Sequence, residues 1–175
     1  MPNYYIYLVS SLPELLFGKE PPFSYDDFLK RCQGLVDENA LDILRMILRI
    51  NDCNYQGNQP TLLRWYLIER QLRNELVKIR AANKQIDPSK YLRIEEFVQP
   101  DIARVATIAY RNPSFLEAER LLDQKRWQVL DELAFGHYFD IDFLIIYGLK
   151  LLILERWKRI NSADKMLLIE DVLKA

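Results

Sequence analysis

The most continuous apolar run of the chain lies in Ile141–Asn161, which reads IDFLIIYGLKLLILERWKRIN. From residue 143 to residue 154 only Gly148 and Lys150 interrupt a run of Phe, Leu, Ile and Tyr, so a helix here is apolar on nearly every side. Such a helix lies inside a protein or a membrane. A membrane-spanning helix needs about 20 predominantly apolar residues, and this run is shorter and contains a lysine. We therefore expect a buried central helix around which the rest of the chain packs.

Both ends of this helix carry boundary signals. Asp140 can cap the N-terminus, and Asp142 is favourable in the first turn. Asn161 and Ser162 predict a break and a new cap, followed by a separate final helix. That final helix has no stop signal after it, so we expect the chain to be part of a longer protein.

Composition favours one helical domain. Of the 175 residues, 50% are hydrophobic and 28% are charged, which is typical of a globular chain long enough for one core. Five glycines are few, and their scarcity favours helices over the turn-rich strands of a sandwich or barrel. We expect a single domain over residues 1–175, with sub-units 1–55 and 56–175 divided near the loop NDCNYQGNQP at residues 51–60.

The remaining helices are expected in antiparallel pairs. The patterns predict helices over residues 24–34, 37–51, 61–83, 100–111 and 113–135. Ser24 is the expected cap of the first, and Gly34 its stop. For the last, Asn112 is the expected cap, and Phe115 is expected on the buried stripe. Residues 89–98 read as a weak helical connector, and the strand-like segment YYIYLVSS at residues 4–11 predicts either a short helix or an extended segment.

Little in the sequence indicates chemistry. Cys32 and Cys53 stand alone without metal-ligand spacing, so free thiols are expected. His137 lies near Asp140 and Asp142, which would suit a base with an orienting carboxylate or part of a metal site, but a capping or hydrogen-bonding histidine is the simpler interpretation. Phosphate-binding and common hydrolytic motifs are missing from the sequence. We expect no enzyme activity, cofactor, metal or small-molecule substrate.

One helix has a basic surface. The helix over residues 61–83 and the residue that follows it carry more Lys and Arg than Glu, the basic residues being Arg64, Arg70, Arg73, Lys78, Arg80 and Lys84. This surface could meet an acidic protein or a phosphate backbone. The simpler interpretation is a solvated face with intrahelical pairs such as Glu69 with Arg73. The formal net charge of −1 argues against nucleic acid as a partner.

The same helix carries a resemblance to a known family. Residues 68–83, IERQLRNELVKIRAAN, resemble the helix that recurs in the C subunit of A- and V-type ATPases, subunit d in eukaryotes. Its acidic residue, Asn and Arg correspond to Glu69, Asn74 and Arg80. Residues 151–161, LLILERWKRIN, look like a second copy that keeps Glu155, Arg156 and Arg159 but not the Asn-to-Arg spacing.

The N-terminal part adds a second resemblance. The segments YYIYLVSSLP and SYDDFLKRC resemble an uncharacterised bacterial family encoded beside V-type ATPase subunits, which is distantly similar to the C subunit. These resemblances imply an all-α repeat fold of antiparallel helical pairs, without catalysis. The C subunit acts as a socket between the central shaft and the membrane rotor ring.

The resemblance therefore implies a non-catalytic accessory or central-stalk subunit whose partners are V-type ATPase subunits. The expected location is cytoplasmic, or peripheral at the membrane through that complex, without insertion into the membrane or binding of nucleic acid. Two alternatives remain open: a free-standing helical adaptor and, less favoured, a small helical enzyme centred on His137. The residues with a structural or partner-contact role are expected to be Glu69, Arg73, Asn74, Arg80, Glu155, Arg156 and Arg159. For Glu69, Asn74 and Arg80, interhelical hydrogen bonding is the simpler interpretation.

Overall fold

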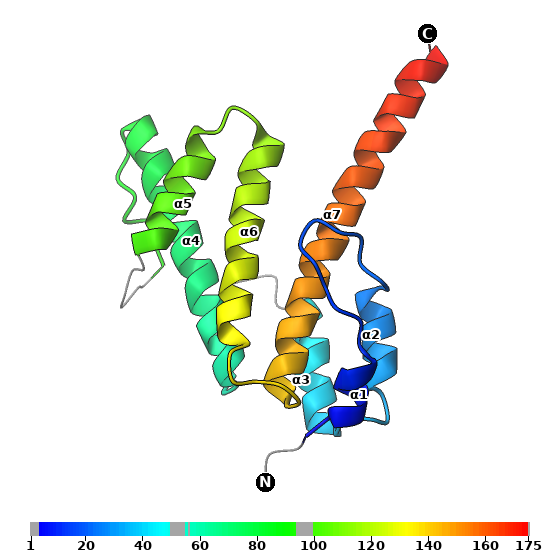
Figure 1. Cartoon of the computed structure of the whole chain (residues 1–175). Coiled ribbons are helices and arrows are strands. Elements are labelled where there is room, and N and C mark those ends of the chain that lie inside the picture. The colour runs from blue at the N-terminus through cyan, green and yellow to red at the C-terminus, as the bar shows by residue number, and fades with distance from the viewer. Residues whose placement is uncertain (1–3, 50–54, 56, 94–99, 175) are drawn as a thin grey trace. The chain divides into compact units, whose positions relative to one another are not determined.

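The protein is all-α in the part of the chain that the structure describes (Figure 1). The computed structural model describes residues 4–49, 55, 57–93 and 100–174, with the backbone alone at residues 49 and 164–174. Every regular element in these ranges is a helix, which confirms the predicted fold class. The helices are α1 (Ile6–Ser11), α2 (Tyr25–Cys32), α3 (Glu38–Arg49), α4 (Pro60–Lys84), α5 (Pro100–Arg111), α6 (Phe115–Leu133) and α7 (Ile141–Lys174).

The chain divides into two compact units. Unit 1 comprises Met1–Arg49 and Leu133–Ala175, and unit 2 comprises Ile50–Glu132. The first boundary between the units, after Arg49, lies close to the loop in which the sequence predicts a boundary. The second boundary, at the end of α6, lies just before Gly136, where the sequence predicts the end of a helix but no division between units. Unit 1 is therefore built from the two ends of the chain.

In unit 1, α7 packs against α2 and α3. The ring of Phe28 lies 5.4 Å from that of Tyr147 and 5.7 Å from that of Tyr25, measured between centroids. The hydroxyl of Tyr25 donates to the carbonyl of Leu44 on α3 at 2.9 Å, so this buried polar group is satisfied. Gly148 allows the close approach, because a Cβ atom there would lie 3.0 Å from the Tyr25 ring.

The central helix is buried, as its apolar run predicts. Residues 144–149 are all buried, and because six consecutive residues point in all directions around a helix, every side of α7 is buried here. The predicted break at Asn161 and Ser162 is wrong, because α7 continues to Lys174. The Ser162 hydroxyl donates to the Lys158 carbonyl at 2.7 Å within the helix. No Gly or Pro lies between residues 161 and 174 to stop the helix.

Other boundaries are confirmed or corrected. Ser24 caps α2 by accepting a hydrogen bond from the Asp27 amide at 3.1 Å, and Gly34 has the predicted left-handed backbone with φ of 79°. The predicted Asn112 cap of α6 is wrong, because Ser114 accepts from the Glu117 amide at 3.3 Å and the helix starts at Phe115. With its first turn shifted in this way, Phe115 is 91% exposed instead of buried.

The structure describes only part of the three segments for which the sequence gives weak or loop-like patterns. Within residues 4–11 the chain forms a short helix, α1 (Ile6–Ser11), which is the first of the two alternatives for this segment. The predicted connector begins with a turn in which the Tyr91 amide donates to the Pro88 carbonyl at 2.9 Å, and its residues 94–99 lie outside the described residues. Residues 51–54, Cys53 included, and residue 56 of the predicted loop also lie outside them.

Unit 2 has its own core, formed where α4, α5 and α6 meet. Leu72 of α4 and Leu122 of α6 pack with three residues of α5, which are Ile102, Ala106 and Ala109. The small alanine side chains allow helices to approach closely. An ion pair between Lys125 on α6 and Asp101 on α5 adds to this packing, and hydrogen bonding by Lys125 lowers the pKa of Asp101.

The environment of Cys32 predicts a protected thiol. Its side chain is fully buried, and burial raises its pKa to about 12. Since the thiolate is the reactive form, we expect Cys32 in a Cys53→Ser variant to resist iodoacetamide at pH 8 in the native state and to react fully in denaturant. Mass spectrometry after timed labelling measures this difference. Rapid labelling of the native variant would contradict the burial of Cys32.

Candidate functional site

Glu69, the acidic residue of the first motif copy, forms an interhelical ion pair. Its carboxylate receives two hydrogen bonds from Arg126 on α6, from Nε to Oε1 at 2.7 Å and from Nη2 to Oε2 at 3.2 Å. Arg126 Nη1 also donates to Asp123 Oδ1 at 2.8 Å, and the Asp123 side chain is only 1% exposed. One guanidinium thus bridges two carboxylates and ties α4 to α6 inside unit 2. The intrahelical pair expected between Glu69 and Arg73 is replaced by this contact.

The charge state of Arg126 follows from its surroundings. Burial alone lowers the pKa of a guanidinium, but here the attraction and hydrogen bonds of Glu69, with those of Asp123, outweigh burial and raise the pKa of Arg126. Arg126 is therefore a permanent cation. A planar guanidinium that binds carboxylates through several hydrogen bonds fixes their geometry as well as their charge.

Asn74, the second motif residue, holds the segment that follows α4. Its amide nitrogen donates to the Arg93 carbonyl at 2.8 Å, and its oxygen accepts from the Arg93 amide at 3.1 Å. The side chain is 2% exposed, so both polar atoms are satisfied where water has little access. Arg73 and Arg80, by contrast, lie on the exposed surface of α4.

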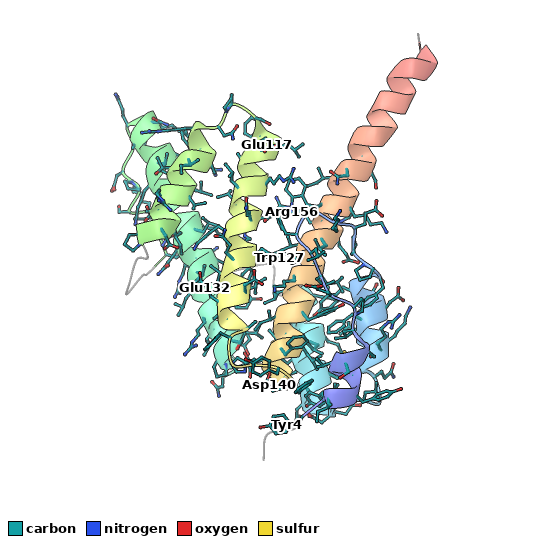
Figure 2. The ribbon with its side chains drawn as sticks, viewed as in Figure 1. Tyr4, Glu117, Trp127, Glu132, Asp140 and Arg156 are labelled. Carbon is teal, nitrogen blue, oxygen red and sulfur yellow. The ribbon has the colours of Figure 1, made fainter. Side chains whose placement is uncertain are left out.

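Glu155, the acidic residue of the second motif copy, also joins two helices. Its Oε1 atom accepts a hydrogen bond from the amide of Tyr25, the first residue of α2, at 2.9 Å. The first amides of a helix have no partner within the helix, and a carboxylate there is favourable. Arg156, labelled on α7 in Figure 2, is half-buried, and Arg159 is exposed.

These contacts show what the motif residues do locally. Glu69 and Asn74 act inside unit 2 and Glu155 acts inside unit 1, each on a different neighbour. The sequence reasoning missed Arg126 and Asp123. A signal existed, because the predicted buried stripe of α6 has a gap between Leu122 and Val129 that only the charged pair at residues 125–126 can fill at helical spacing.

His137 belongs to a cluster at the start of α7. Its Nδ1 atom lies 2.6 Å from Asp140 Oδ2 and 3.7 Å from Asp142 Oδ2. Asp140 Oδ1 accepts from the Phe143 amide at 3.0 Å, so Asp140 is the predicted N-cap of the helix. The histidine therefore braces a capping carboxylate, as the simpler interpretation of the sequence expects.

The same three residues could also hold a cation. One ligand atom from each of His137, Asp140 and Asp142 lies within 4.8 Å of the other two. Imidazole and carboxylate groups together suit several divalent metals. In the structure, however, His137 Nδ1 and Asp140 Oδ2 form a hydrogen bond with each other. The other oxygen of Asp140, Oδ1, accepts the hydrogen bond that caps α7.

The capping residue Asp140 and the histidine bonded to it, His137, should contribute unequally to stability. Replacing Asp140 with Ala removes the N-cap and should cost about 1 kcal/mol in the free energy of unfolding. His137→Gln keeps the cap and should change the same free energy by less than about 1 kcal/mol. Urea denaturation of both variants measures the difference. A larger loss for His137→Gln than for Asp140→Ala would contradict the bracing role.

Comparison with known proteins finds one partial match, to a family without a known function. Residues 99–169 match a family described as Protein of unknown function (DUF2764). This similarity runs from the start of α5 into α7, so it includes Arg126, His137 and Glu155 but neither Glu69 nor Asn74. No match was found among curated proteins or among solved structures. Among the described residues, no helix is both long and apolar enough to cross a membrane.

Proposed function

We propose that this chain is a non-catalytic helical subunit that acts as a scaffold in a V-type ATPase. The observation that carries the proposal is the use of Glu69, Asn74 and Glu155, which resemble motif residues of the ATPase C subunit. Each of them makes a contact that holds one helix or segment against another. A subunit that connects moving parts needs helices that keep their geometry under load.

The two motif copies support this proposal because the acidic residue of each copy binds a second helix. Glu69 holds α6 through Arg126, and Glu155 holds α2 through the Tyr25 amide. In both copies a carboxylate on a long helix fixes a second helix of the same unit. Residues with this role rigidify a scaffold and leave the outer surfaces available for partners.

Affinity purification of the tagged full-length protein from its native source tests the proposal. We expect V-type ATPase subunits to be recovered by mass spectrometry, in amounts that survive a moderate salt wash. Recovery of other proteins without any ATPase subunit would support the free-standing adaptor instead.

A further inference from the structure

One end of unit 1 exposes an unusual group of large apolar side chains, here called the aromatic end. Its members come from two segments far apart in sequence, namely residues 4–7 and residues 135–139. They are Tyr4 (65% exposed), Ile6 (58%), Tyr7 (79%), Phe135 (88%), Tyr138 (65%) and Phe139 (37%). Gathered apolar side chains of this size mark interaction sites on soluble proteins.

The backbone brings the two segments together. The Tyr5 amide donates to the Phe139 carbonyl at 2.5 Å, which joins the start of α1 to the loop before α7. Tyr5 and Leu8 point into unit 1 and are buried, so Ile6 and Tyr7 are turned outward on the opposite side of α1. Figure 2 labels Tyr4 and Asp140 close together at this end of the unit.

An acidic pocket lies beside the aromatic end. Its volume is about 280 Å³, and it is lined by Tyr5, Asp37, Asn39, Ala40, Ile43, Asp140, Ile141 and Asp142. Three of these residues are aspartates, and the described residues that line the pocket include no Lys or Arg. Two of the carboxylates are fixed in place: Asp37 accepts from the Tyr5 hydroxyl at 2.5 Å, and Asp140 caps α7.

We infer that the aromatic end and its acidic pocket bind a protein segment that presents a Lys or Arg side chain between apolar side chains. The negative charge of the three aspartates would attract the cation, and the aromatic rings would cover the apolar neighbours and the aliphatic stem of the cationic side chain. The inference rests on the proposed role as an interaction subunit, but not on which assembly the chain joins.

The negative charge of the pocket favours a basic protein segment over a second copy of the chain, nucleic acid or an anionic lipid surface. A symmetric contact with a second copy would bring the aspartates of both copies into one interface without a Lys or Arg from the pocket to balance them, which is unfavourable. The carboxylates would also repel phosphate groups, so nucleic acid and anionic lipid surfaces fit poorly. A basic and apolar protein segment satisfies both parts of the surface at once.

A peptide titration tests the inference on the full chain. The probe is a short fluorescent amphipathic peptide of Leu and Lys, and the comparison peptide has Glu in place of every Lys. We expect the Lys peptide to bind, the Glu peptide not to bind, and Tyr7→Ser or Tyr138→Ser each to weaken binding by roughly tenfold. Asp142→Asn should weaken binding and reduce its dependence on salt, because it removes one charge from the pocket.

Phe115→Ser is the matched control. Phe115 is 91% exposed but lies in unit 2, so its replacement should leave peptide binding unchanged. Equal weakening by Phe115→Ser, equal binding of the Glu peptide, or no binding at all would overturn the inference. Dimerisation of the chain that Tyr7→Ser abolishes, or binding that requires added Mg²⁺, would assign the surface to another occupant. The peptide assay contains no ATPase subunit. A negative result would therefore overturn the peptide-binding inference and leave the proposed role in a V-type ATPase to be decided by the purification experiment.

Discussion

Leu151→Ala is expected to destabilise the protein by roughly 2–5 kcal/mol, a large share of the stability of a small domain. The Leu151 side chain is fully buried, and its helical position places it on the same side of α7 as Tyr147 and Gly148, which contact α2. Truncation removes apolar contacts and leaves a cavity that close-packed neighbours can fill only in part.

Leu152→Ala is the matched control, and calorimetry measures both variants. Leu152 is adjacent in sequence and identical in chemistry, but its side chain is only half-buried, so its loss should cost distinctly less. The apolar run by itself predicts Leu152 to be buried as well, and the structure corrects that expectation. Equal melting temperatures for the two variants would contradict the packing described for α7.

Replacing Arg126 with Ala should cost about 3–5 kcal/mol, because it leaves two carboxylates without their cation. Asp123 is almost fully buried and Glu69 is only 14% exposed, so water can replace little of the lost interaction. The free energy of unfolding in urea measures the loss.

Arg73→Ala is the control for this prediction. Arg73 lies on the exposed surface of α4, where an ion pair contributes little, so its replacement should cost less than about 1 kcal/mol. A similar small effect of both substitutions would show that the contacts of Arg126 add nothing to the link between α4 and α6.

Signals that act locally predicted the helices well. Pro100 and the apolar spacing after it locate α5 at the bounds that the structure gives, and Ser24 caps α2 as predicted. Capping, proline and glycine preferences depend on a few neighbouring residues, so a sequence reveals them without knowledge of the tertiary structure.

Features that depend on distant parts of the chain were missed. A helix that is apolar on all sides has no polar face to set its orientation, so the sequence does not separate the burial of Leu151 from that of Leu152. The partner of Glu69 is 57 residues away, and helical spacing favours the nearby Arg73. Asn161 and Ser162 are tolerated inside helices as well as at caps, which explains the wrong break in α7.

We propose that the chain is a structural subunit of a V-type ATPase. The most direct measurement is its stoichiometry in the intact ATPase purified from the native source through a tag on another subunit. We expect the chain to be present in a fixed ratio to the central-shaft subunits and to remain after a high-salt wash. Absence of the chain, or a variable trace amount, from a preparation that hydrolyses ATP and retains its rotor ring would contradict it.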